Sequence, residues 1–419
     1  MSPVIFLAAL FISVPVAIVL VVTSIWYIWE SGNTILYDSF AQKMFAGLEN
    51  YGLLAIPLFM LTGELMNEGG MTRRLIALAR IFVGGFRGGL AYINLLTNMF
   101  MAAIIGSATA QIAVMSRAMV PAMQEEGYDK GFATATTAAG GLLAPVIPPS
   151  MMFVIFGVLA QVPIGDMFIA GIIPGLMLAG GFACVITLIG WSQNFPKGQW
   201  MTKAEALKAL IAALPAMLVP LAIIGGILFG IATPTESAAI ASLIAFLVGW
   251  LIYRDLDPRA LGEMFKRTAA NASMILFMIA AASVFGWVII YEELPQKLAG
   301  LLTLITANPF VFLLIVNLAL LLVGMVIDGI AAIILITPIL LPIAVGSYDI
   351  SPFQFGIVAC LNLVLGLLTP PVGIGLYIAS SMSGASPGAI LKSLWPFLIV
   401  VLCVLILLSY FPILSTYLI

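Results

Sequence analysis

Two long apolar stretches of this chain are broken near their centres by adjacent prolines. One reads GLLAPVIPPSMMF, from Gly141 to Phe153, and the other reads GLLTPPVGIGLYI, from Gly366 to Ile378. A proline inside a helix removes a backbone donor and clashes with the preceding turn, which costs about 3 kcal/mol. Because backbone carbonyls freed at membrane depth are tolerated only where protein or water surrounds them, each break must be enclosed by partners.

The rest of the chain has the composition of a polytopic membrane protein. Of its 419 residues, 63% are hydrophobic and 8% are charged, a balance that is foreign to soluble globular domains. An apolar helix of about 20 residues can cross the hydrocarbon core of a bilayer. We therefore expect membrane spans at 4–29, 47–66, 131–160, 163–191, 209–230, 235–253, 268–290, 352–381 and 387–413.

Two further apolar regions are too short for two complete crossings and a loop. Residues 89–124 are interrupted at Gly106–Thr109, and residues 308–345 are interrupted at Gly324–Gly329. Irregular backbone of this kind is found in membranes only where it is buried in protein or lines a wet cavity. Each region is therefore expected to form a re-entrant hairpin, in which two half-length helices meet at a tip.

The same features recur in the same order about 220 residues apart. Each half carries an amphipathic stretch (71–86 and 292–306), a hairpin, a short loop and a proline-broken helix. The sequence thus predicts an all-α polytopic membrane protein built as an inverted repeat, a common architecture of secondary transporters. The halves are expected at 1–208, with its hairpin at 89–124 and broken helix at 131–160, and at 209–419, with its hairpin at 308–345 and broken helix at 352–381.

Basic residues predict the orientation of the chain, because loops that stay in the cytoplasm are enriched in lysine and arginine. They form three clusters, which counting the crossings places on one side: Arg73, Arg74, Arg80 and Arg87; Lys197, Lys203 and Lys208; and Arg254, Arg259, Lys266 and Arg267. We expect the N-terminus in the cytoplasm and the C-terminus on the opposite side of the membrane. The two hairpins then enter the bilayer from opposite faces.

Several classes of function are excluded by what the sequence lacks. The chain has no histidine, which removes HExxH zinc proteases and Ser-His catalysis together. It also has no GxxxxGK[ST] motif for ATP. We therefore expect neither an enzyme nor a cofactor nor a nucleic-acid partner, and a chain driven by an ion gradient or by another subunit.

The broken helices favour an ion or substrate site over a pair of simple proline kinks, because the breaks are matched in a repeat. Unwound carbonyls, together with the hydroxyls of Ser150 and Thr369, offer oxygen ligands to a small hard cation such as Na⁺. The half-helix N-termini offer partial positive charge to an anionic substrate. Asp328 lies deep in an apolar run at the second tip, where a carboxylate is a functional candidate; a protonated Asp at a turn is the alternative.

The first tip is uncharged, and its residues admit two interpretations. Ser107 and Thr109 supply oxygens to a ligand, or they are small residues that let the helices pack closely. Asn94, Asn98 and Asn362 either line the site or cross-link helices, and the second interpretation is favoured.

Several motifs resemble one family. GGILFGIATPTESAAIA (Gly225–Ala241), IPLFMLTGELMNEGGM (Ile56–Met71), GLLAPVIPPS and LLTPPVGIGLY are similar to the large membrane subunit of TRAP transporters, the DctM-like family. The resemblance implies import of organic acids, of the C4-dicarboxylate or sialic acid type, driven by Na⁺ as the coupling ion. It further implies an elevator mechanism with a scaffold and a moving transport domain, a small four-helix (DctQ-like) membrane subunit and a periplasmic substrate-binding protein. The membrane is then expected to be the inner membrane of a bacterium, with the C-terminus of this chain in the periplasm.

The resemblance also places the ligands by position. The first sodium site is expected to combine the tip at Gly106–Thr109 with the break at Pro148–Ser150, and the second to combine Asp328 with the break at Thr369–Gly373. The sodium ligands so expected are Gly106, Ser107, Thr109, Pro148, Ser150, Gly324, Asp328, Thr369, Pro370 and Gly373, and the substrate contacts are Ser107, Asn98 and Ser150. The sequence does not show the role of Glu236 in the TPTE stretch, and a cap of the following helix through Thr235 is the simplest interpretation.

Two alternatives to a subunit of a Na⁺-coupled symporter stay open. One is a stand-alone ion or dicarboxylate transporter of related build. The other is a channel or a scaffold subunit that transports nothing. Uptake by the symporter subunit requires a binding protein, a small subunit and Na⁺. Uptake by a stand-alone transporter requires this chain alone. A channel or a scaffold subunit accumulates no substrate against a gradient.

Overall fold

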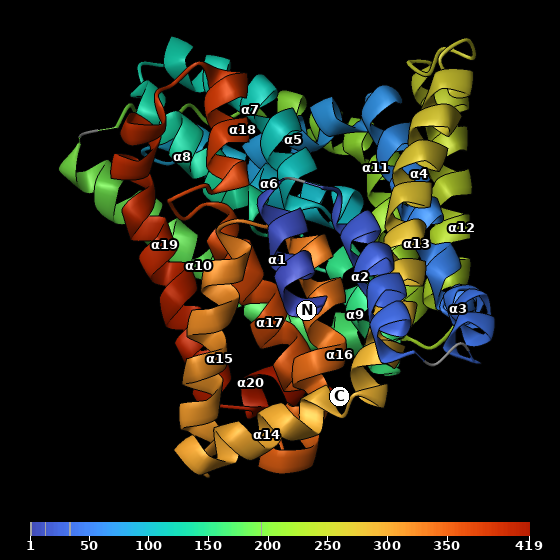
Figure 1. Cartoon of the computed structure of the whole chain (residues 1–419). Helices are drawn as coiled ribbons and strands as arrows, with labels where there is room; N and C mark the ends of the chain where they lie inside the picture. Colours follow the sequence, from blue (N-terminus) through green and yellow to red (C-terminus); the bar gives the residue numbers. More distant parts are fainter. Residues whose placement is uncertain (1, 13, 33–34, 194) are drawn as a thin grey trace.

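The computed structural model describes residues 2–12, 14–32, 35–193 and 195–419, which are almost entirely helical (Figure 1). The helices of the N-terminal part are α1 (Ser2–Phe11), α2 (Val16–Ser31), α3 (Ile35–Ala46), the 3-10 turn Tyr51–Leu54, α4 (Ala55–Glu68) and α5 (Met71–Val83). They are followed by α6 (Gly89–Ile105), α7 (Ala108–Glu125), α8 (Lys130–Gly141), α9 (Met151–Ala160) and α10 (Ile164–Ser192).

The second half repeats much of this order. Its helices are α11 (Lys203–Leu228), α12 (Pro234–Leu247) with a π-helical end (Val248–Tyr253), α13 (Leu261–Tyr291), α14 (Leu294–Ile305), α15 (Pro309–Gly324), α16 (Gly329–Tyr348), α17 (Pro352–Leu367), α18 (Ile374–Ser383), α19 (Pro387–Tyr410) and α20 (Ile413–Thr416). Within the described residues, six helices are long and apolar enough to cross a membrane, or up to eight if each bent pair counts as one span. The multi-pass architecture expected from the sequence is confirmed.

The two re-entrant hairpins are present. Helices α6 and α7 form the first, α15 and α16 form the second, and they enter the molecule from opposite ends so that their tips approach one another (Figure 1). Their arms have 17, 18, 16 and 20 residues, which makes them longer than the half-length helices expected. The expected hairpin regions already had this length, since 89–124 and 308–345 agree closely with the observed 89–125 and 309–348.

Both proline-containing stretches interrupt their helices as predicted. The chain leaves the helical conformation between α8 and α9 and again between α17 and α18. The bonds Pro148–Pro149 and Pro370–Pro371 are both cis. Ser150 is the N-cap of α9, and Gly373, with φ of 56°, is the N-cap of α18.

The two halves interlock around the tips. The second arm of the first hairpin, α7, packs against α18, and the second arm of the other hairpin, α16, packs against α9. Each hairpin is thus held by the broken helix of the opposite half as well as by that of its own half. The boundary between the halves at residues 208 and 209 stays a prediction.

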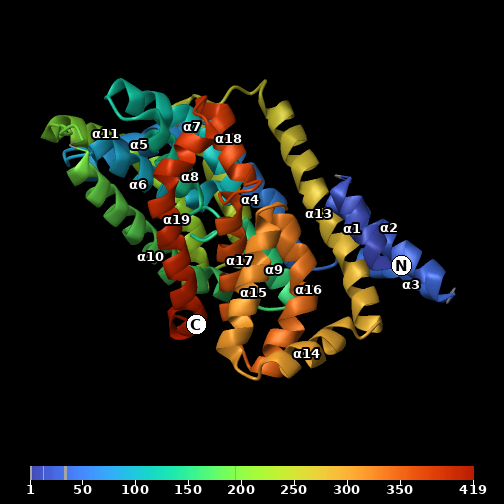
Figure 2. The same ribbon diagram turned by 60° about the vertical axis from the view of Figure 1, so that its left-hand side comes forward.

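A separate group of helices flanks the hairpins. Helices α2 and α3 pack along α13, and α1 packs on α2. Figure 2 shows this group on one side of the molecule, with α15, α16 and α17 beside it and α14 crossing below. The hairpins and broken helices form a hairpin-bearing body, α1–α3 and α13 form a layer beside it, and α4, α5, α11 and α12 pack on one another as a further group.

The N-terminal region differs from the expectation of a single span at 4–29. Helix α1 ends at Phe11 and α2 begins at Val16, so the stretch forms two helices. The physical cause is Pro15, which has no backbone N–H to give to a continuous helix and precedes α2 with φ of −52°. Helix α3 was also not expected.

The three basic clusters lie together at one end of the molecule, as their predicted placement on one side requires. Arg87 forms an isolated antiparallel bridge with Lys197. Arg74 binds the carboxylate of Asp255 at 2.7 Å, next to Arg254 of the third cluster. The side of the membrane that this end faces stays a prediction.

Candidate ion site between the hairpin tips

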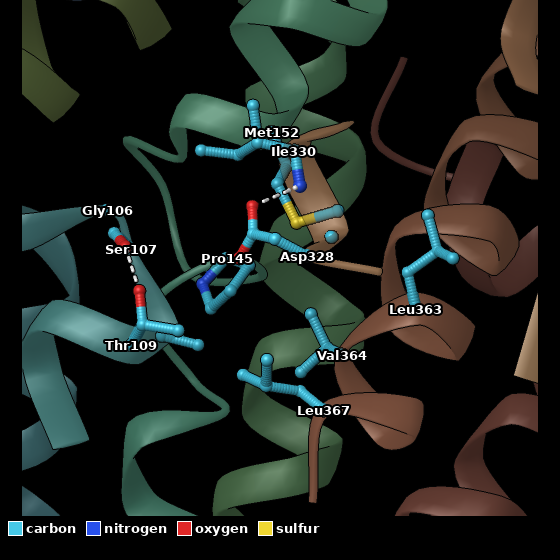
Figure 3. A pocket seen from close by; sticks show the side chains of 12 residues that line it. Gly106, Ser107, Thr109, Pro145, Met152, Asp328, Ile330, Leu363, Val364 and Leu367 are labelled. Atoms are coloured by element: carbon cyan, nitrogen blue, oxygen red, sulfur yellow. Dashed lines mark hydrogen bonds between the residues drawn. The ribbon is translucent and has the colours of Figure 1, made fainter. Parts of the chain in front are cut away.

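A small cavity lies where the two tips meet. Residues from both hairpins, from the first break and from α17 line it: Gly106, Ser107, Ala108, Thr109, Pro145, Met152, Asp328, Gly329, Ile330, Leu363, Val364 and Leu367. Figure 3 shows Ser107 and Thr109 on one side, Val364 and Leu367 on another, and Asp328 between them. Its volume of about 20 Å³ suits one water molecule or one bare ion and is too small for an organic acid.

The first tip is a two-residue turn of hydroxyl and glycine. Gly106 ends α6 in the left-handed region, with φ of 62°, and Ser107 begins α7 with an extended backbone. The hydroxyls of Ser107 and Thr109 are hydrogen-bonded at 3.1 Å. A methyl group on Gly106 would lie 3.2 Å from Met151 Cγ and 3.4 Å from the carbonyl oxygen of Pro149, so this tip rests directly on the first break.

The first break is buried, and the hydroxyl of Ser150 already forms hydrogen bonds within the break. Ser150 donates to the carbonyl oxygen of Pro145 at 2.6 Å and accepts from the N–H of Phe153 at 3.3 Å. Pro145 is the member of this break that lines the cavity. Pro148 lines an apolar cavity on the side of α10 and α11 instead. Ser150 therefore acts on the cavity through Pro145.

Among the described residues that line the cavity, only Asp328 of the second tip carries a carboxylate. Asp328 is the N-cap of α16 and accepts from the N–H of Ile330 at 3.0 Å. On its other side Asp328 faces a larger cavity of about 660 Å³ between the α1–α2 junction, α13 and the second tip. The carboxylate thus stands between a space of ionic size and a space of ligand size.

The second break holds its tip through backbone contacts. A methyl group on Gly366 would lie 2.5 Å from the carbonyl carbon of Gly324, so the two glycines pack backbone to backbone. The N–H of Gly373 donates to the carbonyl oxygen of Met325 at 3.1 Å. The hydroxyl of Thr369 is turned back to the carbonyl oxygen of Leu365 at 2.7 Å, which closes the end of α17.

The structure brings some of the expected sodium ligands together and leaves others behind the lining. Gly106, Ser107, Thr109 and Asp328 share the cavity. Gly324 and Gly373 support the second tip from behind, and Pro148, Ser150, Thr369 and Pro370 lie outside the cavity lining. Hydroxyl, carboxylate and carbonyl oxygens are the ligands that hard cations prefer, so the lining fits a cation such as Na⁺.

The buried asparagines cross-link helices, which was the favoured of the two interpretations. Asn94 donates to the hydroxyl of Thr137 at 2.7 Å, and Asn362 donates to the side chain of Asn317 at 2.9 Å. Asn98, expected to contact substrate, is fully buried in a network with Asn94 and Gln111 and lies outside the cavity lining. Gln111 was missed by the sequence analysis, although a glutamine in an apolar arm was a visible signal.

The helix that follows Gly230 has a different cap from the one expected. Thr233, rather than Thr235, accepts from the N–H of Glu236, and the Glu236 carboxylate accepts from the Thr233 N–H at 2.8 Å. This reciprocal pair is a capping box. Thr235 instead donates to the carbonyl oxygen of Tyr51 at 3.3 Å.

Comparison with known proteins identifies relatives over nearly the whole chain. Residues 4–414 match the family described as the DctM component of tripartite ATP-independent periplasmic transporters. The sialic acid TRAP transporter large permease protein SiaM of Vibrio cholerae is 36% identical over 412 residues, covering 97% of this chain and 95% of the relative. The C4-dicarboxylate large permease DctM of Pseudomonas aeruginosa is 36% identical over 377 residues, covering 90% and 88%.

The 2,3-diketo-L-gulonate large permease YiaN of Escherichia coli is 35% identical, covering 89% of this chain and 87% of the relative. Among solved structures, the YdaH transporter of Alcanivorax borkumensis, described as having an unusual topology, superposes with a TM-score of 0.65 at 15% identity and covers 91% of this chain and 89% of its own. That likeness shows the fold alone. By the family match and these relatives, the chain belongs to the DctM family and is a TRAP transporter large permease.

Proposed function

We propose that this permease imports an organic acid together with Na⁺, which binds between the two hairpin tips. The observation that carries the proposal is the shared cavity, in which Ser107 and Thr109 of one hairpin face Asp328 of the other. Because the tips come from opposite halves, an ion held between them links both halves of the repeat.

The electrostatics of the site explain why ion and acid would move together. A carboxylate in an apolar setting is costly unless it is neutralised or paired. Na⁺ bound at Asp328 removes that cost and also removes the repulsion between Asp328 and an anionic substrate. The acid therefore binds well only after Na⁺ is present, and that order of binding is the basis of coupling.

The substrate is proposed to be an organic acid of the sialic acid or C4-dicarboxylate type. The relatives are named for sialic acid, C4-dicarboxylates and 2,3-diketo-L-gulonate. The cavity of about 660 Å³ beside Asp328 lies in the size range of small-molecule sites. Its described lining is apolar apart from Asp328, so Na⁺ bound at Asp328 would neutralise the one charge there that repels the acid.

We further propose an elevator movement. The hairpins and broken helices pack on one another, and α13 with α1–α3 forms the layer beside them (Figure 2). The hairpin-bearing body would carry ion and acid across the membrane against this layer.

The orientation in the inner membrane is a separate proposal, with the N-terminus in the cytoplasm. Labelling single cysteines at Ser347 and Gln199 tests it, since reagents should reach the two positions from opposite sides of the membrane.

Reconstitution of the complete system tests the proposal. The permease is placed in liposomes with its small subunit, the periplasmic binding protein is added outside, and uptake of candidate acids is measured with and without a Na⁺ gradient. We expect accumulation only when all three proteins and Na⁺ are present. Accumulation by this chain alone would favour a stand-alone transporter, and equilibration without accumulation would favour a channel.

A further inference from the structure

The first hairpin contains a continuous chain of buried amides directly behind its tip. The Nε2 of Gln111 donates to Asn98 Oδ1 at 2.9 Å, Asn98 Nδ2 donates to Asn94 Oδ1 at 2.8 Å, and Asn94 Nδ2 donates to Thr137 Oγ1 at 2.7 Å. All four side chains are fully buried. The chain of bonds begins on α7, crosses α6 and ends on α8, so it joins both arms of the hairpin to the broken helix.

Gln111 is the link nearest to the cavity. It lies one turn after Ser107, and its backbone N–H donates to the Ser107 carbonyl oxygen at 3.0 Å. Its side chain also donates to the Asn98 carbonyl oxygen at 2.9 Å and to the Gly140 carbonyl oxygen at 3.4 Å. A single amide therefore holds the first turn of α7 against two other helices.

Packing alone does not explain why an amide side chain occupies position 111. Its Oε1 is buried without a hydrogen-bond partner among the described residues, and a buried acceptor of this kind carries a desolvation penalty that an apolar side chain would avoid. The equivalent position of the second hairpin, four residues after the N-cap, is Ala332. The second hairpin has an amide link between Asn317 of α15 and Asn362 of α17, but it has no amide at the position that corresponds to Gln111.

We propose that Gln111 is a positioning residue for the ion site. Its amide fixes the first turn of α7, and with it the hydroxyls of Ser107 and Thr109, at the place where a cation between the tips needs them. Neutral oxygens bind a cation weakly unless they are held in place, because each must lose its freedom on binding. The inference rests on the proposed Na⁺ coupling.

The test separates ion affinity from stability. Gln111→Met keeps the volume and removes the amide, and Asn98→Leu removes its partner. In the reconstituted complex, we expect each variant to raise the Na⁺ concentration for half-maximal uptake by about tenfold, with the rate at saturating Na⁺ little changed. The double variant should show no larger shift than Gln111→Met alone, because Gln111→Met already removes the bond between the Gln111 and Asn98 side chains.

Gln354 provides the matched control. It is the other buried glutamine, and its amide donates to the carbonyl oxygens of Leu408 and Ser409, both at 3.1 Å, away from the tips. Gln354→Met should lower the melting temperature of the complex as Gln111→Met does, and should leave the half-saturating Na⁺ concentration unchanged.

The outcomes separate this inference from the proposed function. Na⁺-dependent wild-type uptake with an unchanged half-saturating Na⁺ concentration in both Gln111→Met and Asn98→Leu would overturn the inference alone. An equal shift in Gln354→Met would reduce Gln111 to a structural residue and overturn it as well. Wild-type uptake that ignores Na⁺ would overturn the proposed coupling and this inference with it.

Discussion

The two hairpin tips occupy equivalent places in the repeat, yet they are built in different ways. The first is a short turn with hydroxyls, held from behind by the Gln111 amide and resting on a buried break. The second carries the Asp328 carboxylate and is held by backbone contacts to a break whose Val372 is 40% exposed. The first tip thus presents neutral hydroxyls beside a buried break, and the second presents a carboxylate beside a more exposed break.

This difference indicates a division of labour within the repeat. A carboxylate attracts a cation at long range and tolerates small displacements, whereas hydroxyls contribute only at contact distance. The half with the charge can therefore be open, and the half with hydroxyls must be fixed. Variants at equivalent positions of the two halves should have unequal effects.

The largest effect is expected at Asp328. Asp328→Ala should lower Na⁺-driven uptake by about 100-fold or more, because it removes the one charged side chain among the described residues of the cavity lining. Ser107→Ala at the other tip should retain measurable uptake with a raised requirement for Na⁺. Uptake assays at several Na⁺ concentrations, on variants matched for inserted protein, distinguish the two. Equal losses in both variants would refute the division of labour.

A clear contrast is also expected in the accessibility of the breaks. In a background with the exposed Cys184 and Cys403 changed to Ala, Val372→Cys should react with a water-soluble maleimide several times faster than Val146→Cys, which is 1% exposed in the wild type. Mass spectrometry of the purified protein measures the labelling. Similar rates at both positions would mean that the first break is as open as the second.

The glycine contact of the second half should be sensitive to a single methyl group. Gly366→Ala places a Cβ 2.5 Å from the Gly324 backbone, and overpacking of this kind lowers the free energy of unfolding by about 1–3 kcal/mol. Gly180→Ala is the control, since a methyl group there meets nothing within 4 Å. Thermal unfolding in detergent measures both, and equal melting temperatures would show that the tip does not depend on this contact.

A smaller loss is expected at the first tip. Gly106→Ala meets Met151 at 3.2 Å and must keep a φ of 62°, which costs about 1–2 kcal/mol for a residue with a Cβ. Gly230→Ala has a similar φ of 63° and no atom within 4 Å. The difference between the two melting temperatures isolates the contact of the first tip with its break, and a larger loss at Gly230 would contradict that contact.

Much of the architecture was predictable because proline and glycine act locally. The breaks at Pro148–Pro149 and Pro370–Pro371 and the tips at Gly106 and Gly324 follow from backbone chemistry that a sequence displays. The rest of the architecture depends on contacts between segments that are far apart in the sequence. Gly366 against Gly324 and Met325 against Gly373 join segments far apart in the chain, and no spacing rule predicts them.

The expected sodium ligands show the same limit of prediction from sequence. A sequence places Ser150 and Thr369 beside unwound carbonyls, but it does not show that both hydroxyls are used within their own segments. Nor does it show that Pro145 is the proline that lines the cavity. The split of the first span at Pro15 was visible as a proline and was overlooked, because the apolar run around it is long enough to cross a bilayer.

The most direct test of the account is equilibrium Na⁺ binding to the purified complex, measured by isothermal titration calorimetry without substrate. Wild-type protein should bind Na⁺ saturably, and Asp328→Ala should lose most of that binding while it remains folded. Unchanged Na⁺ binding by folded Asp328→Ala protein would contradict the claim that the ion lies between the two tips.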